Sequence, residues 1–187
     1  EYSIIKSGKP SPSKGECKTD LYIRAHNIEK KESREFKVSI KLDTAEFIEN
    51  KTSLERAQQI LGPNATQIIS EASKTINFKF DQANLIKRKA DSSFTVLIGW
   101  KFEIFFDTSR RLSVQPNLTV TQKEEILSGK NNNADKKNAI VNGSRVINSG
   151  IADTFLEISS DLNLVSTMTI QEIVNKFESI SSVVNRK

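Results

Sequence analysis

The amino-acid sequence predicts an α/β fold of the α+β kind, in which helices flank a central sheet. Two stretches, 19–25 and 36–41, alternate apolar and polar residues as half-buried strands do. Three later stretches carry Thr followed three positions on by Glu, a capping box typical of helix starts. A length of 187 residues suits one domain, so we expect a single domain over residues 1–187.

Residues 2–5 read as a first strand, and 19–25 and 36–41 as the next two. The faces predicted to be buried carry six apolar residues: Leu21, Ile23, Ala25, Phe36, Val38 and Ile40. The faces predicted to be polar carry Asp20, Tyr22, Arg24, Lys37, Ser39 and Lys41. If the two strands pair in register, Asp20 lies near Ser39 and Lys41 on the shared polar face.

Helices and further strands are expected along the rest of the chain. A capping box at Thr52 and Glu55 predicts a helix to about residue 61. The next elements expected are a helix over 65–74, a strand over 76–80 and a helix over 82–90 that begins at Asp81. Strands are then expected within 94–107 and over 111–115, where β-branched and aromatic residues are frequent.

The C-terminal third is predicted to be richer in helices and loops. A capping box at Thr121 and Glu124 predicts a short helix that ends at Gly129. Asn142-Gly143 between apolar pairs indicates a hairpin over 139–147. A last helix is expected over 170–180, beginning at the capping box of Thr169 and Glu172.

Composition limits the classes of partner and chemistry. The net charge of +5 and pI of about 9.3 favour an acidic partner, with nucleic acid the first candidate. No run approaches the ~20 apolar residues that span a bilayer, so no membrane association is expected. The single cysteine, Cys17, is typical of a reducing cytoplasm. The single histidine, His26, argues against a zinc site, and no nucleotide-binding glycine motif is present.

One motif resembles a known family. Lys18-Thr19-Asp20 precedes an apolar strand, and Ser39-Ile40-Lys41 closes a second strand. This pattern resembles the PD-(D/E)xK nuclease superfamily, and more narrowly the type II restriction endonucleases that carry G-x-x-K-T-D before the first catalytic strand. The resemblance covers residues 10–62 and departs from the family at Ser39, where Glu or Asp is usual.

The resemblance implies a restriction-endonuclease-like core, with a mixed sheet flanked by helices. That core usually has a helix before its first strand. Because residues 2–5 already read as the first strand here, we expect that helix to be absent or supplied from elsewhere. What it implies for function is a Mg²⁺-dependent endonuclease that hydrolyses double-stranded DNA.

The resemblance also implies a site. Asp20, the backbone carbonyl of Ile40 and the Glu16 carboxylate would hold Mg²⁺ or Mn²⁺ against the scissile phosphate. Lys41 would orient or deprotonate the attacking water, and Ser39 would donate to a metal-bound water. Glu16 can equally be a surface residue. Lys18 and Gln58 are supporting candidates, and Gln58 can equally be a surface glutamine.

Basic residues outside this site are candidates for DNA contact. They are Lys9 and Lys14 in the loop over 6–16, and Lys87, Arg88 and Lys89 on the helix predicted over 82–90. A solvated surface explains each of these groups equally simply, and the same holds for the Asn-rich stretch 130–137. The sequence also leaves open whether one chain acts alone or a homodimer cuts both strands.

Two other functions remain open. The first is a non-catalytic DNA-binding or assembly module, in which Ser39 marks a degenerate metal site. The second is a structural interaction protein whose positive charge has no nucleic-acid partner. Salt-dependent DNA binding separates the first of these from the second, and metal-dependent DNA cleavage separates the nuclease from both.

Overall fold

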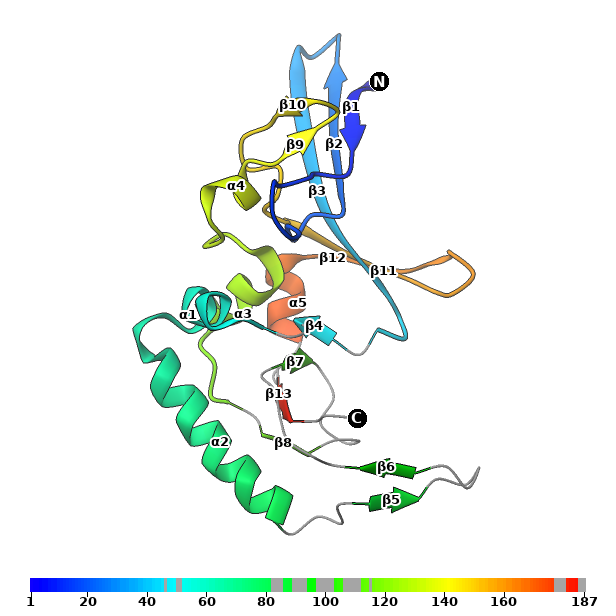
Figure 1. Ribbon diagram of the computed structural model, residues 1–187. Coiled ribbons are helices and arrows are strands. Elements are labelled where there is room, and N and C mark those ends of the chain that lie inside the picture. Colours follow the sequence, from blue (N-terminus) through cyan, green and yellow to red (C-terminus); the bar gives the residue numbers. More distant parts are fainter. Residues whose placement is uncertain are drawn as a thin grey trace. The chain divides into compact units, whose positions relative to one another are not determined.

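The computed structural model describes residues 1–45, 47–49, 52–81, 86–88, 94–96, 103–105, 112–114, 116–176 and 181–184 (Figure 1). The chain divides into two compact units. The first unit comprises Glu1–Ala45 with Lys123–Lys176, and the second Glu46–Gln122 with Phe177–Lys187. The single domain expected over 1–187 stays a prediction.

The first unit is built on a five-stranded mixed sheet. Its strands are β1 (Tyr2–Gly8), β2 (Leu21–Asn27), β3 (Glu32–Leu42), β11 (Thr154–Ile158) and β12 (Leu164–Thr169). The order is β1-β2-β3-β11-β12; β11 runs parallel to β3, and the other neighbours are antiparallel. The predicted α+β class with a central mixed sheet is thereby confirmed.

Three helices and a small hairpin complete the first unit. They are α3 (Val120–Ser128, which begins in the second unit), α4 (Ala134–Lys137), α5 (Ile170–Lys176), β9 (Ile140–Val141) and β10 (Ser144–Arg145). Helix α5 packs on β11 and β12 through buried Ile173 and Val174. The capping box predicted for α5 is confirmed, because Thr169 Oγ1 accepts from the Glu172 N–H and Glu172 accepts from the Thr169 N–H.

The second unit has helices and a second sheet. Its elements are β4 (Phe47–Glu49), α1 (Leu54–Leu61), the 3₁₀ turn Gly62–Asn64, α2 (Ala65–Asp81), β5 (Ile86–Arg88), β6 (Phe94–Val96), β7 (Glu103–Phe105), β8 (Leu112–Val114) and β13 (Ser181–Val184). The sheet order is β4-β7-β13-β8, and β5 pairs with β6. In the described parts of 94–107 and 111–115, the predicted strands are present.

Helix α2 corrects two sequence predictions. The strand expected over 76–80 is helical, because α2 continues to Asp81. Ala72 and Ile76 lie one helical turn apart and are both buried, so the apolar stripe of the helix extends through this segment. Asp81 therefore ends a helix rather than beginning one. The helix expected over 82–90 is wrong at 86–88, which form β5, and its other residues lie outside the described ranges.

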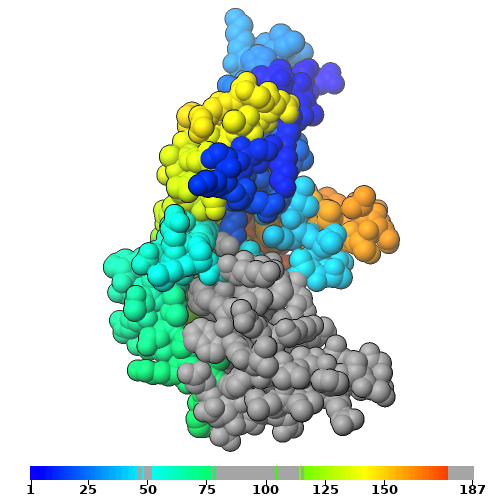
Figure 2. Space-filling view, viewed as in Figure 1, coloured from blue at the N-terminus to red at the C-terminus, as the bar shows by residue number. Residues whose placement is uncertain are grey.

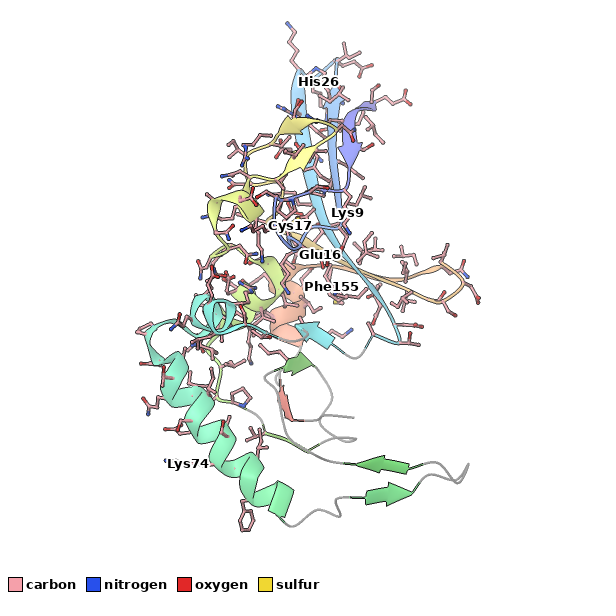
Figure 3. All side chains as sticks on the ribbon, viewed as in Figure 1. Lys9, Glu16, Cys17, His26, Lys74 and Phe155 are labelled. Atoms are coloured by element: carbon pink, nitrogen blue, oxygen red, sulfur yellow. The ribbon has the colours of Figure 1, made fainter. Side chains whose placement is uncertain are left out.

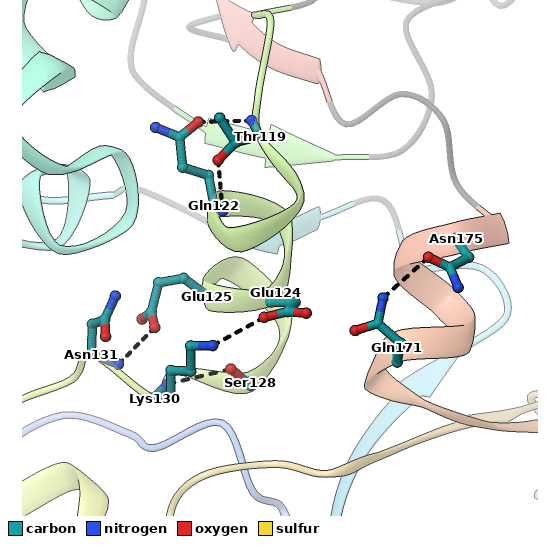
Figure 4. A network of polar contacts seen from close by, with 9 residues as sticks. All are labelled: Thr119, Gln122, Glu124, Glu125, Ser128, Lys130, Asn131, Gln171 and Asn175. Carbon is teal, nitrogen blue, oxygen red and sulfur yellow. Dashed lines mark hydrogen bonds and ion pairs between the residues drawn. The ribbon is translucent and has the colours of Figure 1, made fainter.

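Two helix starts differ from the predicted capping boxes. Ser53, not Thr52, caps α1, and its hydroxyl accepts from the Arg56 N–H at 3.1 Å. At the start of α3, Thr119 and Gln122 cap each other's backbone N–H groups at 3.2 and 2.9 Å (Figure 4). Both starts lie within two residues of the predicted positions, since glutamine or a neighbouring hydroxyl satisfies a free N–H equally well.

The two predicted faces of the β2–β3 hairpin are only partly as expected. Tyr22, assigned to the polar face, is fully buried, and its hydroxyl donates to Glu35 at 2.7 Å. Phe36, assigned to the buried face, is 44% exposed. The reason is that β11 pairs with residues 38–42 of β3 only, so the sheet narrows at Phe36. Within the described residues, no helix is long and apolar enough to cross a membrane.

The buried Tyr22 phenol predicts an alkaline dependence of stability. Burial, together with the hydrogen bond to Glu35, raises the pKa of Tyr22 to about 12. Since the fold favours the protonated phenol, the contribution of Tyr22 to the free energy of unfolding is present below pH 10. It is lost as the pH rises towards about 12. We expect the urea unfolding midpoint of Tyr22→Phe to fall less steeply over this range than that of the wild type. An equally steep fall in both proteins would contradict this role.

Gly150 is required by close packing in the first unit. A Cβ atom at this position would lie 1.8 Å from the Lys136 carbonyl oxygen and 2.8 Å from the Cys17 Cβ. Because the nearest atom belongs to the backbone, the clash is relieved only if the backbone at Lys136 or Gly150 moves. We expect Gly150→Ala to lower the free energy of unfolding by about 3 kcal/mol, the upper end of overpacking costs.

A suitable control for Gly150→Ala is Gly143→Ala. Gly143 has a φ of +77° but no atom within 4 Å of its Cβ position. Its cost is therefore backbone strain alone, about 1 kcal/mol. Urea unfolding of both variants measures the difference, and equal losses of stability would show that the contact with Lys136 is not limiting.

Candidate functional site

The register of β2 and β3 ends just after Asp20. Leu21 pairs with Val38, and Asp20 is the residue before β2. The Asp20 N–H also donates to the Val38 carbonyl, at 2.8 Å, so the register shifts by one residue at this point. Ser39 and Lys41 are two positions apart on β3, so their side chains point to the same face. The expected grouping of Asp20 with Ser39 and Lys41 on that face stays a prediction.

The Asp20 carboxylate is held against β3 at the point where β2 begins. Its Oδ2 accepts the Ile40 N–H at 2.8 Å, in the place where a backbone carbonyl of a longer β2 would accept it. In a strand the N–H and C=O of one residue face the same edge, so the Ile40 carbonyl faces the Asp20 side as well. The site thus brings together two oxygen donors, the carboxylate of Asp20 and the carbonyl of Ile40.

Two lysines flank Ser39 on this face, and they differ in their surroundings. The Lys37 amine lies 3.4 Å from Asp153 Oδ2, and the Lys37 N–H donates to Asp153 Oδ1 at 3.1 Å. The half-buried Lys41 amine forms no ion pair or hydrogen bond with the residues that the structure describes. Lys37 therefore ties β3 to the start of β11, whereas Lys41 is available for a ligand.

Ser39 is covered rather than open. Its exposed fraction is 4%, and its partner in register on β11 is the buried Phe155. A side chain this enclosed has little contact with bulk water. The position that carries an acid in the resembling family is therefore occupied here by a small, buried hydroxyl.

The supporting candidates are spread over several elements. Glu16 lies in the loop after β1 with its side chain 82% exposed, and one carboxylate oxygen is 3.7 Å from the Lys9 amine (Figure 3). The half-buried Lys18 runs over Gly129, where an added Cβ would lie 2.7 Å from the Lys18 Cγ. Gln58 is exposed on α1 and belongs to the second unit. Lys14 is exposed in the loop after β1.

The basic helix face predicted over 87–89 is corrected. Lys87 and Arg88 belong to strand β5, which pairs with β6, and Lys89 lies outside the described residues. The helix that was expected to carry these residues is therefore not formed at 86–88. Their role in DNA contact stays a prediction.

Sequence reasoning missed two acids that the parallel strand brings to the same face. Asp153 is the partner of Lys37, and Glu157 is in register with Lys41. The Glu157 carboxylate accepts from the Ser166 hydroxyl at 3.1 Å, towards β12. No local signal could have identified these neighbours, because more than 100 residues separate β3 from β11 in the sequence.

The donor set fits a hard cation that keeps much of its water. In the described part of the chain, no three His, Cys, Asp or Glu side chains are grouped to hold a metal ion. Mg²⁺ is commonly bound through one or two carboxylates, with waters and substrate phosphate as the other ligands. Asp20 and the Ile40 carbonyl are compatible with that mode, and Glu16 would have to leave Lys9 to join them.

Comparison with known proteins adds no relative, because no family model, curated protein or solved structure matches the chain.

Proposed function

We propose that the protein is a Mg²⁺-dependent DNA endonuclease of the restriction type, which hydrolyses phosphodiester bonds in double-stranded DNA. The observation that supports the proposal is the hydrogen bond from the Ile40 N–H to the Asp20 carboxylate, which holds that carboxylate beside the strand that carries Lys41. A mixed sheet is also the architecture that the resemblance to PD-(D/E)xK nucleases implies.

Each residue of the site has a distinct role in this proposal. Asp20 and the Ile40 carbonyl hold Mg²⁺ or Mn²⁺, which when bound supplies a Lewis acid beside the scissile phosphate. The hydrogen bond from the Ile40 N–H fixes the Asp20 carboxylate before any ligand arrives. The Lys41 amine orients or deprotonates the attacking water and offsets negative charge that develops on the phosphate oxygens.

A second candidate function follows from Ser39. With a buried serine where the resembling nucleases carry an acid, the alternative is a non-catalytic DNA-binding or assembly module. That module would bind DNA through its basic residues and would leave the DNA intact. It shares the DNA partner with the nuclease and differs from it only in the absence of metal-dependent hydrolysis.

Incubation with supercoiled plasmid tests the proposal. We expect nicked and linear DNA in the presence of Mg²⁺ or Mn²⁺ and intact plasmid when EDTA is added. Salt-sensitive DNA binding without cleavage in either metal would reject the nuclease in favour of the alternative. Restriction activity in the cytoplasm requires cuts in both strands. The products also report the oligomeric state: a single chain nicks the plasmid before it linearises it, whereas a homodimer that makes both cuts at once yields linear DNA without a nicked intermediate.

A further inference from the structure

Two segments far apart in sequence, 7–18 and 129–150, fold against one another in the first unit. Ser11 and Ile140 exchange two backbone hydrogen bonds of 2.9 and 3.1 Å. The Asn142 amide donates to the Ser7 carbonyl at 2.7 Å, and the Lys18 N–H donates to the Gly150 carbonyl at 3.2 Å. Figure 2 shows the dark-blue and yellow atoms of these segments side by side. We call the two segments together the basic lobe.

The basic lobe contains the whole net charge of the protein. It has seven of the 28 Lys and Arg residues but only two of the 23 Asp and Glu residues, an excess of five. The remaining residues carry 21 basic and 21 acidic side chains and are therefore neutral in sum. The seven basic residues are Lys9, Lys14, Lys18, Lys130, Lys136, Lys137 and Arg145.

Both acids of the basic lobe are engaged within it. Asp135 Oδ2 accepts from the Ser13 hydroxyl at 2.7 Å and from the Ser13 N–H at 2.8 Å, and its Oδ1 lies 3.9 Å from Arg145. The hydroxyl bond from Ser13 in particular lowers the pKa of Asp135. Glu16 pairs with Lys9 at 3.7 Å. The two carboxylates thus pair with neighbours inside the lobe, and Lys130 pairs with Glu124, just outside it, at 3.0 Å.

One lysine of the second segment reaches the first segment. The Lys136 amine lies 3.6 Å from the Cβ position of Gly15, the residue that follows exposed Lys14. Lys136 and Lys137 are partly exposed in the last turn of α4, whose first turn is capped by Asn133. Because hydrogen bonds already fix the backbone of both segments, a ligand that binds these amines has mainly their side chains to order.

We propose that the basic lobe binds the phosphate backbone of double-stranded DNA. The proposal rests on the DNA partner of the proposed function but not on its catalytic step. A concentrated excess of positive charge on a fixed surface is the electrostatic footprint of a nucleic-acid-binding protein. The lobe also carries six asparagines, a side chain that hydrogen-bonds to phosphate oxygens and base edges, and so favours DNA over an anionic membrane.

The double variant Lys136→Gln/Lys137→Gln tests the proposal against Lys30→Gln/Lys31→Gln. The control lysines are exposed in the turn between β2 and β3 of the same unit, outside the lobe. Binding of a fluorescein-labelled DNA duplex is followed by anisotropy with Ca²⁺ in place of Mg²⁺, at salt concentrations from about 50 to 200 mM. We expect the lobe variant to bind the duplex at least about 10-fold more weakly at low salt. The plot of log association constant against log salt concentration should also become less steep by about two units, one for each lysine replaced.

The outcomes separate this proposal from the nuclease. Equal weakening of DNA binding in the lobe variant and in the control would overturn the proposed role of the basic lobe. That result would not bear on the nuclease proposal. Tight binding to phosphatidylserine vesicles with no binding to the duplex would overturn it too. If the lobe variant binds the duplex more weakly than the control but the protein never cleaves DNA, the role of the basic lobe is supported and only the nuclease proposal is rejected.

Discussion

Replacement of Asp20 by Asn is expected to abolish Mg²⁺-dependent DNA cleavage and to leave the fold intact. The amide oxygen of Asn can still accept the Ile40 N–H, so the contact that extends the strand ladder is kept. The negative charge that a hard cation requires is lost. We expect the cleavage rate to fall on the order of 10³-fold or more, while the urea unfolding midpoint stays close to that of the wild type.

Asp20→Ala separates the two roles of this carboxylate. The alanine variant loses both the charge and the acceptor for the Ile40 N–H, and an unsatisfied backbone N–H at a partly buried position costs about 1–3 kcal/mol. Asp20→Ala should therefore be inactive and also less stable, whereas Asp20→Asn should be inactive only. Wild-type cleavage by the asparagine variant would show that Asp20 has only its structural role.

Replacement of Lys41 by Met has the second of the large expected effects. Lys41 is the amine on the site face that has no partner among the described residues, and its removal deletes the cation that offsets charge on the phosphate. Loss of one such group commonly reduces turnover about 10²–10³-fold. Cleavage rates at saturating Mg²⁺ measure the loss, and the unfolding midpoint should change little because no contact of the fold is removed.

Lys37→Met is the matched control for Lys41→Met. The two lysines lie on the same strand and the same face, but Lys37 is paired with Asp153. Loss of that partly exposed pair should cost on the order of 1 kcal/mol of stability. We expect the Lys37 variant to cleave DNA at the wild-type rate at a temperature where it is folded. Equal losses of activity in both variants would mean that the chemistry does not depend on Lys41 in particular.

Local signals predicted much of the fold, and the misses have identifiable causes. The Thr169–Glu172 capping box and the Asn142-Gly143 hairpin are confirmed because a few neighbouring residues determine each of them. The strand expected over 76–80 was wrong, since the alternation there also fits an apolar helical stripe that includes Ile76. Packing of that stripe decides between the two structures, and packing is not visible in a short window of sequence.

In the candidate site too, the contacts set by neighbouring residues could be predicted, and those set by distant segments could not. The β2–β3 hairpin, which brings the Asp20 carboxylate to the Ile40 N–H, is local, and the alternation of its residues was enough to predict the two strands. The pairing of Lys37 with Asp153 depends on a parallel strand more than 100 residues away. The basic lobe was missed for a similar reason, because its lysines are spread over two distant segments and gather only in the fold.

The most direct measurement of the central claim is anomalous diffraction from crystals soaked in Mn²⁺. If Asp20 and Lys41 form one metal-dependent site, a manganese peak should lie in direct contact with the Asp20 carboxylate and the Ile40 carbonyl, with the Lys41 amine on the same face of the sheet. The peak should be absent from crystals of Asp20→Asn. Crystals without a peak at Asp20, or with Asp20 and Lys41 on opposite faces of the sheet, would contradict the claim.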